Sequence, residues 1–345
     1  MNKNNKRYDI YQLRSRNRLR LAVTFAVFSL VVMTLSSLCI YILHRALKLG
    51  VNYWIMLFLF WLLFAIYVIL RYALGFRRLF ENFRLLPSRE NDPRLEDALS
   101  SVKLASGMSE QIKLFVFPNA DINSFSLALP DGSYALLATQ GVADKLPARE
   151  REAIMAHEVA HMRMGDALIH TVMIRLAGRR SLRRIASGLD AQGISPLKLA
   201  GASMFVITLL WVLLIYTAFA STEDGVRPQY TATFLWLGIA LLFAALASVL
   251  PLFIHKFLQF LMDKERECYA DLEAVYLTRD PEAVYRAIKS ASNDIIDLLL
   301  LPACFDALLF HPVVNYTSYA PFRTQPTMTE RMQKLKELYP QVDDS

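Results

Sequence analysis

The sequence has 345 residues, of which 54% are hydrophobic, and its mean hydropathy is +0.30. Such a composition is typical of a membrane protein and argues against the two ordinary soluble domains that the length alone would permit. The net charge is +7, and residues 1–20 carry +6 of it, with seven basic side chains and one acidic one. The rest is nearly neutral, so binding to nucleic acid has little support. Three cysteines, Cys39, Cys268 and Cys304, form no spaced disulfide framework and are consistent with a reducing compartment.

Four apolar runs without charged residues are each long enough to cross a bilayer, which takes a helix of about 20 residues. They cover residues 21–43, 51–70, 199–220 and 232–254. The first run is too long for the apolar part of a signal peptide and lacks a cleavage site, so we expect it to be retained. None of the runs keeps the polar stripe of a soluble core helix. The sequence therefore predicts two transmembrane hairpins, in residues 21–74 and 199–258.

The charges that flank these runs predict the orientation in the membrane. Basic residues dominate the tail 1–20 and the polar stretches after the second and fourth runs, whereas the loop 221–230 holds two acids and one arginine. The loop 44–50 has two basic residues and points weakly the other way. Because cytoplasmic segments carry the excess of Lys and Arg, we expect a multi-pass protein of the bacterial cytoplasmic membrane with both termini in the cytoplasm. His170 and His255 are interpreted as membrane-proximal polar residues.

Two polar parts remain, residues 75–198 and 259–345. The first begins with a proline-containing linker, followed by a predicted short helix near residues 94–105. Three strand-like runs then cover residues 112–117, 122–127 and 134–138, separated by turn signals. The sequence thus predicts a mainly α-helical membrane protein with an α+β cytoplasmic domain that contains a small sheet.

The next predicted helix carries a His-Glu-x-x-His motif and extends from Pro147, a suitable first residue, to Gly165, a suitable stop. His157 and His161 are four residues apart, so both imidazoles project from one face and can share a Zn²⁺ ion. Glu158 points aside from the metal and towards a water molecule bound to it. This spacing is the layout of a zinc hydrolase, provided that the chain supplies a third ligand.

The third ligand is expected on a later helix. Charged neighbours exclude a helix inside the membrane, and Ala167 and Met164 stand where a metzincin would have His and Gly. Glu267 and Asp271 are four apart on one helical face, so one can bind the ion while the other fixes the tautomer of a ligating histidine. Since no clear helix breaker falls between residues 252 and 277, the fourth apolar run is expected to continue into this helix.

With these motifs the chain resembles the HtpX-type membrane zinc endopeptidases, which are similar to the prenyl-protein (CAAX) endopeptidases of eukaryotes. The matching positions are His157, Glu158, His161 and Asp166; then Glu267, Ala270 and Asp271; then Asn123, Ser124, Phe125 and Ser126; and finally Gln325, Pro326, Glu330, Arg331 and Met332. The likeness spans most of residues 95–335. Gln325 replaces the family's His, and residues 295–322 are an apolar stretch of their own, whose His311 could substitute for it.

The resemblance implies a gluzincin with one Zn²⁺ per chain, held by His157, His161 and Glu267, and with Glu158 as the general base. Asp166, Asp271 and Arg331 are expected to support the ligands from behind. Residues 122–127 are expected to form an edge strand that holds an extended substrate as an added strand, with Asn123, Ser124, Phe125 and Ser126 in contact with it.

These expectations combine into a membrane-bound zinc endopeptidase that cleaves membrane or misfolded proteins at the cytoplasmic face. Its partners would be protein or peptide substrates and the lipid bilayer. One alternative is a membrane sensor with a non-catalytic zincin domain, although the intact Glu158 argues against it. Another is a prenyl-protein endopeptidase, which should need more transmembrane helices than four.

Overall fold

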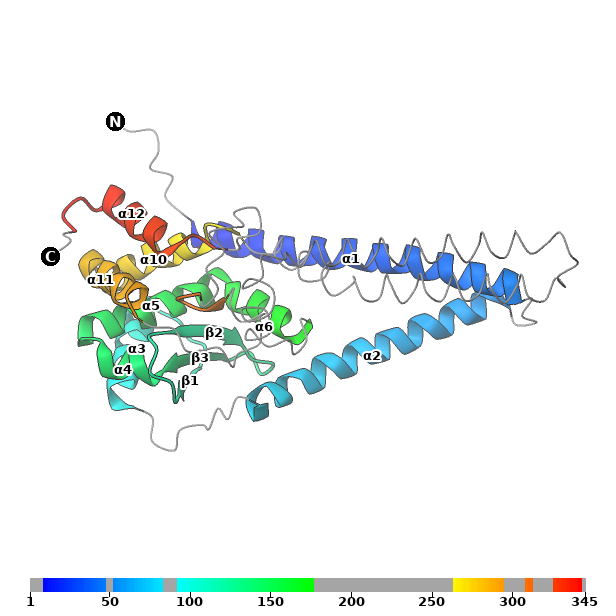
Figure 1. Cartoon of the computed structure of the whole chain (residues 1–345), viewed down its shortest axis with the longest axis horizontal. Coiled ribbons are helices and arrows are strands. Elements are labelled where there is room, and N and C mark those ends of the chain that lie inside the picture. Colours follow the sequence, from blue (N-terminus) through cyan, green and yellow to red (C-terminus); the bar gives the residue numbers. More distant parts are fainter. Residues whose placement is uncertain are drawn as a thin grey trace, which may run out of the picture.

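The structure, a computed structural model, describes residues 9–47, 52–82, 92–176, 263–294, 308–312 and 325–342. The predicted runs 199–220 and 232–254, the loop between them and His255 lie outside these residues. Two long helices project from a compact part that contains the sheet and the remaining labelled helices (Figure 1).

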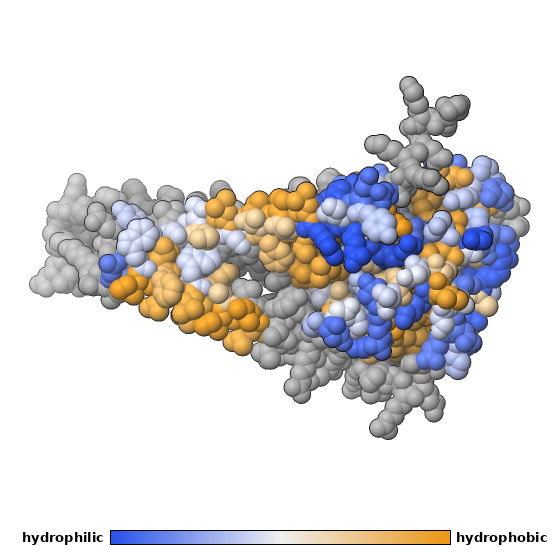
Figure 2. All heavy atoms as spheres, turned by 180° about the vertical axis from the view of Figure 1, so that it is seen from behind, coloured by the Kyte–Doolittle hydropathy of each residue, from blue (hydrophilic) through white to orange (hydrophobic). Residues whose placement is uncertain are grey.

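The projecting helices are α1 (Ile10–Leu47) and α2 (Tyr53–Asn82), and they contain the first two predicted apolar runs. Figure 2 shows apolar side chains gathered along this pair and polar ones over much of the compact part. Among the exposed apolar side chains are those of Leu30, Phe58 and Leu63. No helix in the described part of the chain combines the length and the apolar character needed to cross a membrane. Both runs are helical, as expected, but the predicted membrane crossing is not confirmed.

The compact part begins with α3 (Pro93–Ser106), which Asp92 caps by accepting a hydrogen bond from the Arg94 N–H. Proline in the first turn and Gly107 in the left-handed conformation set the two ends of this helix. The sheet follows with β1 (Ile112–Phe117), β2 (Ser124–Ala128) and β3 (Tyr134–Thr139), in the order β1-β3-β2. β1 is parallel and β2 antiparallel to β3. The predicted helix and three strands are thus confirmed to within a few residues.

β2 starts two residues later than expected because side chains take the preceding backbone donors. The Ile122 N–H donates to Asp294 Oδ2 at 2.8 Å, and the Asn123 N–H donates to Thr139 Oγ1 at 3.0 Å. Neither donor therefore joins the regular ladder with β3.

The central element is α5 (Ala148–Met164), which follows the short helix α4 (Gln140–Lys145) and buries 12 of its 17 residues. It packs against α3, β2, α10 (Arg266–Thr278) and α11 (Pro281–Ser292). Alanines at positions 153, 156 and 160 are all buried and let neighbouring elements approach its backbone closely. The helices α6 (Asp166–Leu176) and α12 (Met328–Leu338) complete the compact part.

Two predicted helix starts are wrong. α5 begins at Ala148, and Pro147 is its extended N-cap residue. α10 begins at Arg266 and does not continue upstream, because Asp263 forms a turn: its carboxylate accepts the Glu265 N–H at 3.1 Å and its carbonyl accepts the Arg266 N–H at 3.3 Å. A short acidic side chain that binds nearby backbone groups competes with helix propagation, a signal that the apolar pattern hid.

Candidate metal centre

The His-Glu-x-x-His motif lies in the last turns of α5, among buried residues. His157, Glu158 and His161 are 1%, 1% and 2% exposed. Gly165 ends the helix with φ of 81°, and its N–H reaches back to the carbonyls of His161 and Met162. A residue with a side chain would be strained in this left-handed conformation, so the glycine fixes where α5 stops and α6 starts.

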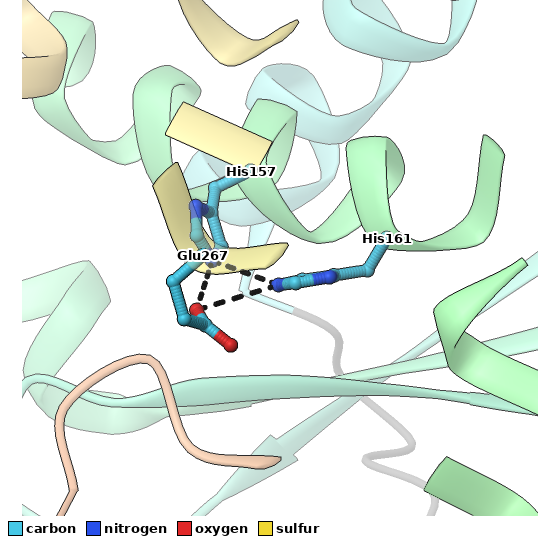
Figure 3. Close-up of side chains that lie close together, drawn as sticks. All are labelled: His157, His161 and Glu267. Carbon is cyan, nitrogen blue, oxygen red and sulfur yellow. Dashed lines mark hydrogen bonds and ion pairs between the residues drawn. The ribbon is translucent and has the colours of Figure 1, made fainter. Parts of the chain in front are cut away.

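α10 brings Glu267 up to the two imidazoles (Figure 3). The two Nε2 atoms of His157 and His161 are 3.1 Å apart, and Glu267 Oε2 lies 3.2 Å from the first and 3.5 Å from the second. Ligand atoms bound at about 2.0–2.1 Å to a tetrahedral Zn²⁺ lie about 3.3–3.4 Å from one another. The three predicted ligand atoms therefore already have the separation that one zinc ion requires.

The other nitrogen of each imidazole is hydrogen-bonded to a carboxylate. His157 Nδ1 donates to Asp271 Oδ1 at 2.9 Å, and His161 Nδ1 donates to Asp166 Oδ2 at 3.0 Å. These bonds select the tautomer in which Nε2 carries a lone pair directed at the shared point. Three acceptor atoms that converge in a buried place repel one another unless a cation lies between them, so this donor set fits a metal ion.

Behind Asp271 stands Arg331 of α12, which is 1% exposed. Its guanidinium makes two bonds to the carboxylate, Nε to Oδ2 at 2.8 Å and Nη2 to Oδ1 at 2.6 Å. A capping box formed by Thr327 and Glu330 fixes the start of α12 and with it the place of Arg331. Arg331 thus holds the carboxylate that in turn holds the His157 imidazole.

The electrostatic field of the site favours positive charge at its centre. Burial by itself lowers the pKa of His161, but the carboxylates of Glu267 and Asp166 outweigh it and raise the pKa to about 10. Burial raises the pKa of Glu267, but the charges of His161 and Arg266 hold it well below the usual range. A site that attracts a proton this strongly without a metal is also attractive to a divalent cation.

Glu158 follows His157 in the chain and is held through one of its two carboxylate oxygens. Ser124 Oγ, at the start of β2, donates to Glu158 Oε1 at 2.6 Å. The other oxygen, Oε2, is buried and has no hydrogen-bond partner. The carboxylate is therefore fixed in orientation, with one acceptor available for a proton.

His157, His161 and Glu267 could hold a metal ion, and the sequence comparisons give the family. Residues 89–339 match the family described as "Peptidase family M48". The chain belongs to peptidase family M48. It is 24% identical over 263 residues to the "Protease HtpX homolog" of Listeria welshimeri, covering 73% of this chain and 76% of that protein. The same name belongs to a Streptococcus equi subsp. zooepidemicus relative, 24% identical over 232 residues, with 67% and 64% covered. The crystal structure of S. mikatae Ste24p has 16% sequence identity and a TM-score of 0.41, covering 94% of this chain and 66% of that one.

In this M48 peptidase, β2 does not offer the free row of backbone groups that the sequence predicted. Its register points the backbone of Ser124, Ser126 and Ala128 away from β3. Ser124 O accepts the Phe310 N–H at 2.9 Å, and Ser126 O accepts His170 Nδ1–H at 3.1 Å. The N–H and C=O of Ala128 both bond to Thr171 Oγ1 at 2.9 Å. The expectation of an unoccupied edge is therefore wrong, because α6 and residues 308–312 already bond to it.

The four residues predicted to contact substrate are mostly enclosed. Asn123, Ser124 and Ser126 are at most 1% exposed, and Phe125 is half-buried. The Asn123 side chain holds the backbone of His311, donating to its carbonyl at 2.7 Å and accepting its N–H at 3.1 Å. Their role in binding substrate stays a prediction.

Gln325, which replaces the family's histidine, is buried and lies beside Arg266, whose Nη2 is 3.5 Å from Gln325 Oε1. Arg266 Nε in turn lies 3.0 Å from Glu267 Oε1, so Gln325 reaches the metal centre through this arginine. Burial, and after it the positive charge of Arg331, lowers the pKa of the His311 imidazole to about 4. No contact between His311 and the three ligand atoms is found in the described chain.

The sequence missed two residues of the M48 site. His170, interpreted as membrane-proximal, is fully buried with its ring centroid 5.4 Å from that of His161. Phe310 packs edge-on against His157 at 4.9 Å between centroids, and Arg331 Nη1 donates to its carbonyl at 2.7 Å. No motif flagged either residue, because each reaches the site only through the packing of separate segments.

Proposed function

We propose that the chain is a membrane-bound, zinc-dependent endopeptidase that cleaves proteins at the cytoplasmic face of the membrane. The observation that carries the proposal is the environment of Glu158, the residue after His157: Ser124 holds one of its oxygens, the other is buried without a hydrogen-bond partner, and His157, His161 and Glu267 bring three ligand atoms together. A sensor without catalysis has no need of a buried carboxylate held in this way.

His157, His161 and Glu267 would hold one Zn²⁺ ion per chain. The ion would supply a Lewis acid that polarises the peptide carbonyl and makes the attacking water more acidic. Glu158 Oε2 accepts the proton of that water and then delivers it to the nitrogen of the leaving amine. Asp271 and Asp166 keep the imidazoles in the ligating tautomer throughout.

The membrane part of the proposal rests on the sequence and on one surface. Most of the apolar side chains exposed along α1 and α2 lie in the two uncharged runs predicted to form the first hairpin. In water such a surface is unfavourable, and a lipid bilayer is the partner whose chemistry matches it. Proteins of the same membrane, and misfolded chains near it, are the substrates that such an anchored peptidase meets.

The test of catalysis compares full-length wild type with Glu158→Gln and Glu267→Ala, purified in detergent, for zinc content and casein cleavage. Glu158→Gln should keep zinc and lose activity by about 10²–10⁴-fold, because the base is gone and the ligands remain. Glu267→Ala should bind zinc at least about 10-fold more weakly. Glu152→Gln, the same kind of change on the same helix but outside the site, is the matched control. Activity of Glu158→Gln within a few-fold of wild type would remove the proposed base.

The orientation has its own test. Reporter fusions within residues 221–230 should report the side of the membrane opposite the catalytic part, and fusions at Ser345 should report the cytoplasm. The reverse pattern would place the metal centre outside the cytoplasm.

A further inference from the structure

The first turns of α1 dock onto the two helices that carry the metal-site residues. Leu13 is 8% exposed and packs in one cluster with Ala160, Met164 and Ala270, next to Ile10 and Tyr269. Ala160 directly precedes His161, and Ala270 directly precedes Asp271. The sequence predicted a basic tail here, whereas the structure places a helix start against the outer side of the metal centre.

Asn17 follows Leu13 by one helical turn and faces the same contact. It is 6% exposed, and its side-chain nitrogen donates to Met164 O at 3.1 Å and to Asp166 Oδ1 at 2.6 Å. These two acceptors stand on either side of Gly165, the residue that ends α5. One amide group from the N-terminal helix thus ties together the end of α5 and the start of α6.

The Asp166 carboxylate is held at both oxygens. Oδ1 accepts the Asn17 amide, while Oδ2 accepts His161 Nδ1–H, and the residue is 3% exposed. A carboxylate fixed by two donors cannot rotate without breaking one of the bonds. We propose that Asn17 is a positioning residue of the metal centre: it orients Asp166, which in turn orients the imidazole of His161. This inference rests on the proposed zinc site.

If Asn17 only anchored α1 to the compact part, its choice as an asparagine would be left unexplained. Leu13 already fixes the helix by apolar contact, and Arg16 and Arg20 pair with Asp263 at 2.6 and 3.1 Å, although such partly exposed pairs contribute little. Asparagine is among the weaker helix formers, so an apolar residue would serve an anchor better. The amide is useful here because it is a donor directed at the carboxylate that holds a ligand.

The consequence is a link between the N-terminal helix and the chemistry of the site. The geometry of His161 depends on the first turns of α1 being in place, even though those turns lie far from the motif in sequence. Undocking them would leave Asp166 with one fixed bond and allow the imidazole to swing.

The experiment uses the full chain in detergent and measures Zn²⁺ affinity by competition with a chelating dye. The variant Asn17→Leu keeps the size of the side chain and removes the donor. Gln12→Leu makes the same chemical change at an exposed position of the same helix. Leu13→Ala removes apolar contact from the same face of α1 and leaves the Asn17 donor and its two acceptors in place. Visible absorption of the Co²⁺-substituted chains reports ligand geometry, and thermal unfolding with chelator reports stability without metal.

Asn17→Leu should weaken zinc binding by about three- to tenfold, less than the loss of a direct partner of a ligand, and should change the Co²⁺ spectrum. Gln12→Leu and Leu13→Ala should stay within about twofold of wild type. In an Asp166→Asn background, Asn17→Leu should add almost nothing, because its target is gone. Equal effects of Asn17→Leu and Leu13→Ala at similar stability, or an unchanged affinity in Asn17→Leu, would overturn the inference. Absence of zinc binding by wild type would instead reject the proposed function.

Discussion

His157 and His161 are equivalent in the sequence motif, yet the structure supports their imidazoles in different ways. The His157 side is charged and comes from elements of the compact part: Asp271 on α10 and Arg331 on α12, all nearly inaccessible. The His161 side has Asp166 at the start of α6 and a neutral amide from α1. The comparison teaches that the His157 imidazole is held through a buried ion pair within the compact part, whereas the carboxylate that holds the His161 imidazole also accepts a hydrogen bond from the N-terminal helix.

The largest effect should come from removing the buried ion pair that supports His157. Arg331→Met removes the guanidinium and leaves the buried Asp271 carboxylate without its counter-charge, which should lower the free energy of unfolding by about 3–5 kcal/mol. Urea unfolding of the detergent-purified chain measures this. Lys334→Met, on the same helix, breaks the partly exposed pair with Glu265 and removes the charge that lies 5.6 Å from the centre of the Tyr269 ring, and it should change the free energy of unfolding by less than about 1 kcal/mol. Equal losses in the two variants would show that Arg331 is not a buried counter-charge.

The two sides can then be compared directly through zinc affinity. Asp166→Asn should weaken binding by about 10–100-fold, because it loses the charged acceptor of His161 Nδ1–H. Asp271→Asn should weaken it at least as much and should also destabilise the fold, since it leaves Arg331 buried without a carboxylate. Chelator competition and unfolding measured on the same samples separate the two effects. A stability loss as large in Asp166→Asn as in Asp271→Asn would erase the difference between the sides.

Lowering the pH should reduce the stability of the fold around His161, because the buried His170 packs against that imidazole. Burial lowers the pKa of His170 to about 3. The unfolded chain, with an ordinary histidine pKa of about 6.5, binds a proton that the folded chain excludes, so this contribution to stability is full above that pH and falls as the pH drops towards 3. His170→Asn keeps an N–H for Ser126 O but does not titrate. Between pH 6.5 and 5.5, metal-free wild type should therefore lose about 1 kcal/mol more than the variant. Parallel stability curves would contradict the assignment.

The smallest effect should come from loosening Glu158. Its carboxylate is held by Ser124, and not by the residues that hold the two imidazoles. Ser124→Ala removes the donor to Glu158 Oε1 and should lower kcat for casein by about threefold, since water can take the place of the hydroxyl. Ser290→Ala is the matched control, because Ser290 donates to Glu150 Oε2 at 3.2 Å on the same helix α5, at its other end. A loss of activity in Ser290→Ala equal to that in Ser124→Ala would mean that the effect passes through α5 as a whole.

Much of the catalytic part could be predicted because its signals are local. Helical spacing alone places His157 and His161 on one face, and Gly165 marks the end of their helix through its left-handed conformation. The strands are short apolar-rich runs separated by turn signals, so the sheet was found as well. The start of α10 was missed because Asp263 acts through side-chain bonds to its neighbours, which hydrophobic periodicity does not detect.

The sequence by itself determined that His157 and His161 share one helical face, that a glutamate stands at position 158, and that Glu267 and Asp271 share a face of α10, since the period of a helix places residues four apart together. Which of the two acids is the ligand was implied only by the family resemblance. Only the tertiary structure decided how those groups are held: Arg331 on Asp271, Ser124 on Glu158, Asn17 on Asp166, and the covered edge of β2. These contacts join residues far apart in the chain, and a polar side chain gives no local sign of its distant partner. The reason is physical: a buried polar group must find a hydrogen bond, but which group supplies it depends on how the elements pack.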